Sequence, residues 1–487
     1  MGFVYSISPF SGEHQFEPLP ESSPQNVAEV VARSVKAGQQ WSRLPLKQRA
    51  SALRAIAKAL EESQHELAEL AHAETALGVE RLLGEIARTC FQMRLFSTAL
   101  ETGSLLRREV DEPVSGPPPQ GHQLLVRTYR PLGPVAVFGA GNFPFAFGQL
   151  GGDTVSALAA GCTVVVKDHP GHPHLAARLM GVASRALRDS GFDSDVLLSV
   201  RGMTAGVALI ENAAIKAGAF TGSQRGGRAF WDLATRRAEP IPFYGEMGSA
   251  NPVFISQAAL AERGEVLAEE LAASLTLGLG QFCTKPSVVF VVDQGAFLEQ
   301  LAGNIEKIEE GHLLSPASLE RFRSAKNQVS AVRGVRKIVA PEESQRELLI
   351  KPGLLGISIS DFLASPGEIL EECFGPLGVV VECSAEADFD AVIDQLEGTL
   401  VSTVQASPGV DKELVGTLVD RLSDISGRVV VNSWPTGLSV TPWQHHGGPY
   451  PATTSALHTS VGLQALLRFV RPVVLQNAAE ELWPNLH

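Results

Sequence analysis

The residue with the most distinctive chemistry in this chain is Cys283. It lies in "GLGQFCTKPS", residues 278–287, after a glycine-rich loop at the end of a predicted helix and just before an apolar strand. Loops at such junctions present side chains to clefts. A thiolate that backbone N–H groups or a nearby base stabilise is a nucleophile. The alternative for this stretch alone is a small buried hydrophobic residue, as most cysteines are.

A carboxylate with a suitable setting for base catalysis is Glu246. It is the only charged residue in "PIPFYGEMGSANPVF", residues 240–254, and follows an apolar extended run. Because a carboxylate beside closely packed backbone loses hydration, we expect its pKa to be raised, as a general base near neutral pH requires. A loop carboxylate that accepts hydrogen bonds from backbone amides is the alternative.

Two glycine-rich turns are candidates for binding phosphate. "VAVFGAGNFPFAFGQLGG", residues 135–152, begins like a dinucleotide-binding turn, but Pro144 stands where the third glycine of that fingerprint belongs. In "KAGAFTGSQRGGRAFW", residues 216–231, Gly222 and Gly227 flank the start of a helix whose free N–H groups suit a phosphate. The second turn is therefore the better phosphate site, although an unoccupied turn has the same pattern.

A lysine ends a short apolar strand in "TVVVK", residues 163–167. Lys167 is thus placed at the carboxyl end of a predicted parallel strand, where open α/β sheets bind ligands. The histidines that follow, His169, His172 and His174, are interspersed with glycine and proline. We interpret that stretch as a solvated loop and expect no metal.

Composition excludes several classes of function. The chain of 487 residues has 53 acidic residues against 40 Lys and Arg, a formal charge of −13, which argues against nucleic-acid and anionic-membrane surfaces. Its five cysteines are widely spaced and form no C-x-x-C pair, which predicts a reducing compartment without structural zinc. The N-terminus has no signal-peptide pattern, so we expect a cytoplasmic protein without a membrane span.

The elements that must position these residues follow a strand–helix alternation. Short apolar strands alternate with helices from residue 135, and a second such series starts near residue 252. The expected strands are 135–138, 163–167, 196–200, 215–220, 252–255, 287–292 and 427–432. The expected helices are 148–160, 174–190, 204–212, 224–236 and 264–277. This pattern predicts two parallel sheets covered on both faces, preceded by helices from about residue 41 to 103.

The motifs occur in the order found in the aldehyde dehydrogenase superfamily, which the chain resembles from about Trp41 to its C-terminal part. The matching segments are Asn142 in "GNFPF", Lys167, "FTGS" at 220–223, Glu246 in "GEMGSANP", Cys283 in "GQFC" and "EECFGP" at 371–376. "GGDTVSALAAGC", "KDHPGHP" and "HGGPYPATT" resemble in particular the branch with α-ketoglutarate semialdehyde (2,5-dioxovalerate) dehydrogenases and an NADP-dependent fatty aldehyde dehydrogenase.

This resemblance implies an NAD(P)-dependent oxidation of an aldehyde to a carboxylate. Cys283 would attack the aldehyde and form a thiohemiacetal, whose oxyanion the Asn142 amide and the Cys283 N–H would hold. Hydride transfer to the nicotinamide would leave a thioester, and Glu246 would activate the water that hydrolyses it. A catalytically silent nucleotide-binding relative and a coenzyme A-acylating enzyme are the alternatives.

The resemblance also implies where the cofactor binds. The implied cofactor-binding residues are Lys167, His169, Thr221, Gly222, Ser223, Gly227, Glu372 and Phe374. Many family members have Lys-Pro-x-Glu where this chain has Lys167-Asp168-His169-Pro170. Because no carboxylate at residue 170 repels a 2′-phosphate, NADP is the favoured cofactor over NAD, with Asp168 as a contrary sign.

The fold expected is α/β, with two Rossmann-like parallel-sheet domains and a small oligomerisation ribbon. Residues 1–115 and 132–248 are assigned to a cofactor-binding domain, 249–455 to a catalytic domain, and 116–131 and 456–487 to oligomerisation segments. The alternating "HQLLVRTYRP" and "LLRFVRPVVLQN" predict a homodimer or homotetramer. The expected channel for the small-molecule aldehyde is lined by Phe143, Phe145, Phe282 and Trp434.

Overall fold

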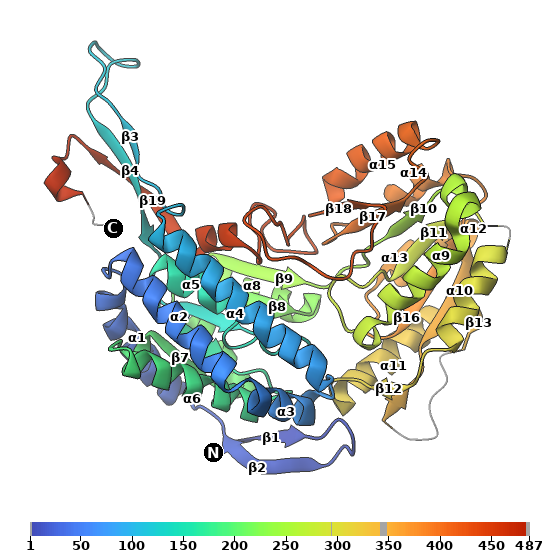
Figure 1. Ribbon diagram of the computed structural model, residues 1–487, viewed down its shortest axis with the longest axis horizontal. Coiled ribbons are helices and arrows are strands. Elements are labelled where there is room, and N and C mark those ends of the chain that lie inside the picture. Colours follow the sequence, from blue (N-terminus) through green and yellow to red (C-terminus); the bar gives the residue numbers. More distant parts are fainter. Residues whose placement is uncertain (1, 294, 341–347, 484–487) are drawn as a thin grey trace.

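The computed structural model describes residues 2–293, 295–340 and 348–483 and contains two parallel-sheet units and a small projecting sheet (Figure 1). The fold class predicted from the strand–helix alternation is confirmed. The domain boundaries stay a prediction.

The first large sheet has five parallel strands in the order β7-β6-β5-β8-β9. Its strands are β5 (Val135–Phe138), β6 (Val164–Lys167), β7 (Leu197–Val200), β8 (Ala217–Gly222) and β9 (Phe243–Met247). Since parallel strands end at one edge, the segments that follow β5, β6, β8 and β9 converge there. This edge carries Asn142, Lys167, Gly222 and Glu246.

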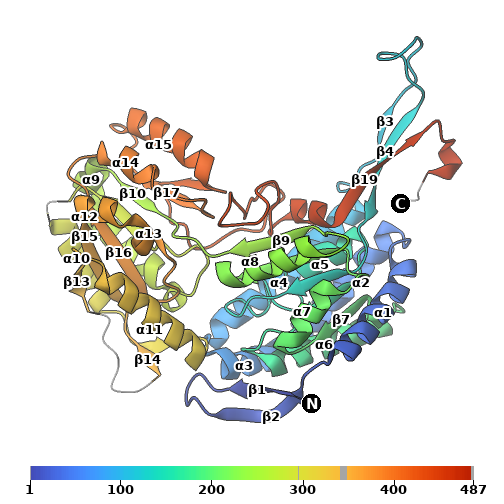
Figure 2. The ribbon, with the colours of Figure 1, turned by 180° about the vertical axis from the view of Figure 1, so that it is seen from behind.

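Helices cover both faces of this sheet because its strands are apolar on both sides. Val135 and Val137 point into one core with α2, α4, α5 and α6, whereas Ala136 and Phe138 point into another with α1, α7 and α8. Figure 1 shows α2 and α4 in front of the sheet, and Figure 2, from behind, shows α7 and α8. The bounds are α1 (Pro24–Trp41), α2 (Leu46–Glu62), α3 (Gln64–Thr75), α4 (Val79–Glu101), α5 (Gly152–Ala160), α6 (Pro173–Asp189), α7 (Met203–Glu211) and α8 (Gln224–Arg236).

The second large sheet has seven strands in the order β13-β15-β16-β11-β10-β17-β18, all parallel except the edge strand β13. Its strands are β10 (Val253–Ile255), β11 (Val288–Val291), β13 (Arg336–Val339), β15 (Gly353–Ser358), β16 (Leu377–Glu382), β17 (Ser402–Gln405) and β18 (Val429–Val431). A two-stranded ladder of β12 (Gly311–His312) and β14 (Leu349–Ile350) lies beside it.

Alternation again divides the side chains between two cores. Val253 and Ile255 pack with α9 and α10, and Phe254 packs on the opposite face with residues of α11, α12, α14 and α15. The bounds are α9 (Gln257–Thr276), α10 (Ala296–Glu306), α11 (Pro316–Ala331), α12 (Ile359–Ala364), α13 (Pro366–Leu370), α14 (Asp388–Ile393) and α15 (Lys412–Ile425).

A three-stranded antiparallel sheet projects from the body of the molecule (Figure 1). It consists of β3 (Glu109–Asp111), β4 (Leu125–Pro131) and β19 (Val470–Gln476), with β4 in the middle. The N-terminal hairpin of β1 (Phe3–Ile7) and β2 (His14–Pro20) lies at the opposite end.

The structure corrects several boundaries predicted from sequence. α1 precedes the expected helical segment and was not predicted, and α9 begins at Gln257, earlier than expected, because Ser256 caps it by accepting a bond from Ala259 N at 3.0 Å. α5 begins at Gly152 instead of 148 because residues 148–151 turn. Residues 466–469, expected to be extended, belong to a 3-10 helix. No helix in the described part of the chain is both long and apolar enough to cross a membrane.

The segment before β19 is anchored to the first unit by a buried ion pair. Arg468 Nη2 lies 2.7 Å from Asp153 Oδ1 at the start of α5, and both side chains are almost completely buried. Arg468 Nε also donates to the carbonyl of Ala465 at 3.1 Å. Burial raises the pKa of Asp153, and Arg468 opposes that rise.

Replacing Arg468 with Met should therefore cost about 3–5 kcal/mol of stability at pH 8, because a buried carboxylate loses its partner. The folded Asp153 then binds a proton more readily than the unfolded one, so the deficit relative to wild type should shrink as pH falls towards 5. Urea unfolding at several pH values measures this. Arg471→Met, at an exposed position of β19, is the control; a deficit independent of pH would contradict the assignment.

Candidate active site

Cys283 lies on a loop whose backbone passes very close to a second loop. Gly280 has φ +64°, and a Cβ there would lie 2.3 Å from the carbonyl oxygen of Gly375. Glycine is therefore required where the "GQFC" segment crosses "EECFGP". The carbonyl of Cys283 accepts a hydrogen bond from Asn251 Nδ2 at 2.7 Å, and the cysteine side chain is half-buried.

A buried lysine holds the same two segments together. Lys285 Nζ donates to the carbonyls of Cys373, Gly375 and Leu377 at 2.7, 2.9 and 2.9 Å. Burial lowers the pKa of Lys285. Its three backbone acceptors satisfy every proton of the ammonium group, which makes a buried lysine tolerable.

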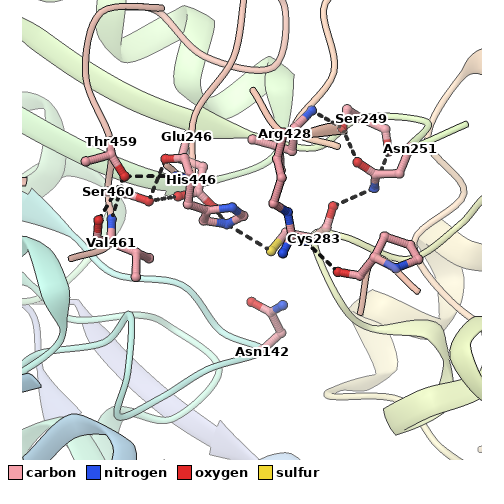
Figure 3. Close-up of polar contacts among 12 residues, drawn as sticks. Asn142, Glu246, Ser249, Asn251, Cys283, Arg428, His446, Thr459, Ser460 and Val461 are labelled. Atoms are coloured by element: carbon pink, nitrogen blue, oxygen red, sulfur yellow. Dashed lines mark hydrogen bonds and ion pairs between the residues drawn. The ribbon is translucent and has the colours of Figure 1, made fainter. Parts of the chain in front are cut away.

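Asn142 lies on the turn after β5 and faces the cysteine loop (Figure 3). Its Nδ2 donates to the backbone carbonyl of Gln281 at 3.0 Å. The backbone carbonyl of Asn142 accepts a hydrogen bond from Arg81 Nη2 at 2.8 Å. The Arg81 guanidinium carbon lies 5.0 Å and 4.9 Å from the ring centroids of Phe143 and Phe282. The Asn142 amide is thus held beside Cys283 by contacts at its backbone and its side chain.

Glu246 lies in β9 and is covered by the C-terminal part of the chain. Residue 246 forms an isolated antiparallel bridge with Thr453, and Met247 N donates to the carbonyl of Ala452 at 2.8 Å. The hydroxyl of Ser460 donates to Glu246 Oε2. These contacts bury the carboxylate at the edge where the strands end.

His446 connects the carboxylate to the thiol, and sequence reasoning did not anticipate it. Its Nε2 lies 2.8 Å from Glu246 Oε1 and 3.5 Å from Cys283 Sγ, as Figure 3 shows. The backbone N–H of His446 donates to Thr459 Oγ1 at 2.8 Å. The three side chains therefore come from β9, from the loop that carries Cys283 (the cysteine loop) and from residues 432–469 between β18 and β19 (the tail segment).

Electrostatics in this group differ from the sequence prediction. Burial by itself would raise the pKa of Glu246, but His446 and Ser460 outweigh it and the pKa is lowered. The prediction of a raised pKa was wrong because it counted desolvation and omitted the cationic partner. Burial likewise opposes protonation of His446, but Glu246 and Cys283 raise its pKa to about 10.

The group is arranged to share protons. The ligand-type atoms of Glu246, Cys283 and His446 all lie within 4.8 Å of one another. Because the carboxylate and imidazole contact each other directly, a protonated His446 is stabilised at neutral pH and presents a cation to Cys283 Sγ. A cation beside a thiol favours the nucleophilic thiolate.

At the end of β6, Asp168, the carboxylate that argued against NADP, is paired with another side chain of the protein. Lys167 and Asp168 are both buried. The Asp168 carboxylate accepts hydrogen bonds from Arg201 Nε at 3.2 Å and from Gln149 Nε2 at 3.4 Å. Burial raises the pKa of Asp168 and Arg201 opposes this. The carboxylate is therefore already paired.

The histidine segment after Lys167 is not the solvated loop that was predicted. His172 is completely buried and its ring stacks on His169, with centroids 5.1 Å apart. A Cβ on Gly141 would lie 2.5 Å from His169 Cε1. The prediction was wrong because the segment packs under the turn after β5, which sequence spacing does not reveal. Gly141 thus leaves room for His169.

The second glycine turn presents a helix N-terminus, as its sequence predicted. Ser223 caps α8, its Oγ accepting a bond from Gly226 N at 3.3 Å, and Gly222 and Ser223 are exposed. Thr221 is the register partner of Glu246 in the adjacent strand. Gly227 is buried, and a Cβ there would lie 2.6 Å from Met247 Sδ, so it lets α8 pack on β9.

Glu372, for which the resemblance implies a place at the nicotinamide ribose, brings a carboxylate close to β9. It lies against the backbone after β9, where a Cβ on Gly248 would be 1.9 Å from its Oε2. Burial raises its pKa to about 7, which Lys285 opposes. No hydrogen bond to its carboxylate is made within the described residues, so both oxygens are available to hydroxyl groups. Phe374, two residues on, is half-buried. With the exposed start of α8, these groups fit a nicotinamide dinucleotide.

Two of the four aromatic residues expected in the substrate channel lie beside Cys283. Phe143 directly follows Asn142, and Phe282 directly precedes Cys283. Their rings contact each other edge to face, with centroids 5.0 Å apart. Phe145 is buried in the core that α2, α4, α5 and α6 form on the first large sheet. Trp434 packs against the core of α9 and α10 on the second large sheet, and its Nε1 donates to Glu270. The expectation that Phe145 and Trp434 line the channel stays a prediction.

The residues that sequence reasoning missed share one property: they act on partners far away in the chain. They are Arg81, Asn251, Gln281, Lys285, His446 and Ser460. For His446 the available signal was "HGGPYPATT", a segment that marks the resemblance but whose first residue carried no assigned role. Gln281, Lys285 and Asn251 likewise lie in quoted motifs without an assigned role.

The chain belongs to the aldehyde dehydrogenase family, whose sequence model matches residues 3–469. It is an NAD(P)-dependent aldehyde dehydrogenase that takes a small-molecule aldehyde and a nicotinamide cofactor.

The chain is similar in sequence to two α-ketoglutaric semialdehyde dehydrogenases, and its fold is similar to that of a solved NADP complex. α-Ketoglutaric semialdehyde dehydrogenase 2 of Azospirillum brasilense is 40% identical over 450 residues, covering 91% of this chain and 85% of that protein. α-Ketoglutaric semialdehyde dehydrogenase of Acinetobacter baylyi is 36% identical over 445 residues, covering 90% and 84%. NADP-dependent glyceraldehyde-3-phosphate dehydrogenase from Bacillus halodurans, complexed with NADP, has the same fold with a TM-score of 0.83, 21% identity and coverage of 98% and 96%.

His446→Gln should slow alkylation of Cys283 by iodoacetamide about tenfold at pH 7, because the thiolate loses its cationic neighbour. Mass spectrometry of the modified cysteine measures the rate. His445→Gln, at the half-buried neighbouring histidine, is the matched control. An unchanged rate in His446→Gln would show that the imidazole does not act on the sulfur.

Proposed function

We propose that this enzyme oxidises α-ketoglutarate semialdehyde (2,5-dioxovalerate) to α-ketoglutarate. The observation that carries the proposal is identity of 36–40% to two α-ketoglutaric semialdehyde dehydrogenases over nine tenths of the chain. The clustering of Cys283, Asn142 and Glu246 supports it. A medium- or long-chain aldehyde is the second candidate, favoured by the phenylalanines beside the cysteine.

In the proposed mechanism Cys283 is the nucleophile. The sulfur of its thiolate, with His446 Nε2 3.5 Å from Sγ, forms a bond to the aldehyde carbon while the carbonyl electrons move to oxygen. Asn142 Nδ2, beside the cysteine loop, and the Cys283 backbone N–H donate to that oxyanion. Nicotinamide, when bound, would supply the hydride acceptor, and Cys283 would hold the resulting thioester.

Glu246 completes the reaction as the base for hydrolysis. Its carboxylate, kept ionised by His446 and Ser460, takes a proton from the attacking water. The carbon–sulfur bond then breaks and releases the carboxylate product. The presence of this base favours water over coenzyme A as the acyl acceptor, and an ordered catalytic group argues against a silent relative.

NADP is the proposed preferred cofactor. Lys167 and His169 would lie at the adenosine ribose, Thr221, Gly222, Ser223 and Gly227 at the phosphates and nicotinamide, and Glu372 with Phe374 at the nicotinamide ribose. Residue 170 is proline and the Asp168 carboxylate is paired with Arg201. Neither therefore repels a 2′-phosphate.

We further propose a homodimer or homotetramer that assembles through the projecting sheet. β3 is exposed along its whole length, and Val110 and Val474 are 44% and 53% exposed on this sheet. An exposed edge of this kind invites pairing with another strand. The five free cysteines support a reducing, cytoplasmic location.

A comparison of 2,5-dioxovalerate, succinate semialdehyde and decanal, each with NADP and with NAD, tests substrate and cofactor together. We expect the highest kcat/KM for 2,5-dioxovalerate with NADP. Absorbance at 340 nm follows the reduced cofactor. Higher kcat/KM for decanal would make the enzyme a fatty aldehyde dehydrogenase, and activity that requires coenzyme A would exclude hydrolysis by water.

Glu246→Gln should release about one reduced cofactor per active site in a burst and then slow by about 10²- to 10⁴-fold, because the thioester forms but is not hydrolysed. Stopped-flow absorbance separates the two phases. Cys283→Ala, which cannot form the thioester, should bind the cofactor but give no burst. A wild-type steady-state rate in Glu246→Gln would contradict the role as base.

A further inference from the structure

Three arginines surround Cys283, and two of them are committed to backbone carbonyls. Arg81 Nη2 donates to the carbonyl of Asn142, and Arg428 Nη2 donates to the carbonyl of Pro435 at 2.8 Å. Figure 3 shows the Arg428 side chain extending towards the cysteine. The third, Arg88 on α4, makes neither a hydrogen bond nor an ion pair with the residues that the structure describes.

The position of Arg88 is defined by an aromatic contact that leads to the catalytic group. Its guanidinium carbon lies 5.3 Å from the centroid of the Phe147 ring. Phe147 also lies beside His446, with ring centroids 6.2 Å apart. Arg88 and the imidazole that contacts Cys283 Sγ therefore share one phenyl ring as a neighbour. Burial lowers the pKa of Arg88, and Glu85, Cys283 and Glu246 oppose this, which places its charge near the same atoms.

The nearest acid on the same helix does not neutralise this cation. Glu85 Oε1 accepts hydrogen bonds from the backbone N–H groups of Phe145 and Ala146, both at 2.8 Å. Burial raises the pKa of Glu85 to about 7, so its charge is weakened at neutral pH. A half-buried guanidinium without an acceptor loses hydration, and no hydrogen bond or ion pair compensates for that loss.

The wall beside Arg88 is apolar. Phe143 and Phe147 pack with Val440 and Val461, which belong to the tail segment that carries His446. A ligand here would therefore lie along a hydrocarbon surface and end at a guanidinium, whose planar fork matches a carboxylate.

We propose that Arg88 binds the distal carboxylate of a short ω-oxo acid while Cys283 attacks its aldehyde carbon. This assignment rests on the proposed function, because 2,5-dioxovalerate is such an acid, and it names the residue that selects for it. Neutral aldehydes of similar length occupy the same apolar wall without the ion pair and are the weaker substrates.

Arg88→Gln should lower kcat/KM about 10- to 150-fold for 2,5-dioxovalerate and succinate semialdehyde, the range expected for hydrogen bonds to a charged group. For pentanal it should change kcat/KM less than about threefold. Arg88→Lys, which keeps the charge but loses the fork, should retain part of the selectivity and protects the test against a folding defect. Arg94→Gln is the matched control, since Arg94 on the same helix pairs with exposed Glu61.

Equal losses for pentanal and for the anionic substrates would overturn the proposal, because Arg88 would then act on the thiol or on Glu246. The proposal is also overturned if Arg428→Gln, and not Arg88→Gln, removes the preference for anionic substrates.

A second measurement does not depend on turnover. Glutarate should protect Cys283 from iodoacetamide in the wild type and not in Arg88→Gln. If the wild type oxidises only neutral aldehydes while glutarate still protects through Arg88, the proposed substrate fails and the carboxylate site stands. Equal protection in the two proteins would overturn the site itself.

Discussion

The contact on which the rest of the site depends is the buried pair of Glu246 and His446, 2.8 Å apart. A carboxylate that ends an apolar strand under a covering segment is costly unless a partner compensates its charge. His446 and Ser460 supply that compensation, and both lie on the tail segment that crosses β9. The covering that excludes water from the carboxylate therefore also brings the imidazole to the cysteine. Arg468 and Asp153 repeat the principle where the same segment leaves the body.

The cysteine loop is positioned by backbone contacts more than by side-chain packing. Gly280 allows it to pass against Gly375, and Lys285 holds the carbonyls of that second loop. Asn251 fixes the carbonyl of Cys283 itself. Such contacts tolerate little displacement, because each involves a buried polar group with a single direction of bonding. Cys283, Asn142 and Glu246 therefore meet although they come from two different sheets.

The charges near Cys283 differ in sign from the net charge of the chain. The chain carries a formal charge of −13, yet three arginines lie around the cysteine and the acids near them are bonded to backbone or to histidine. Net charge supports an expectation about surfaces, but it carries no information about a pocket. The proposed selection of an anionic aldehyde and the proposed acceptance of a 2′-phosphate both depend on how each acid is paired.

The alternation of apolar strands and helices determined two parallel sheets, since the period of the side chains decides which face each one covers. Motif order likewise determined the family and placed Cys283, Glu246 and Asn142 at strand or helix ends. The tertiary structure alone decided that the pKa of Glu246 is lowered, that His172 is buried and that His446 contacts both Glu246 and Cys283. Each of these depends on a partner distant in the chain, 200 residues away for His446 and Glu246, and pairing at that range comes from packing of the tail across β9 and not from any local pattern.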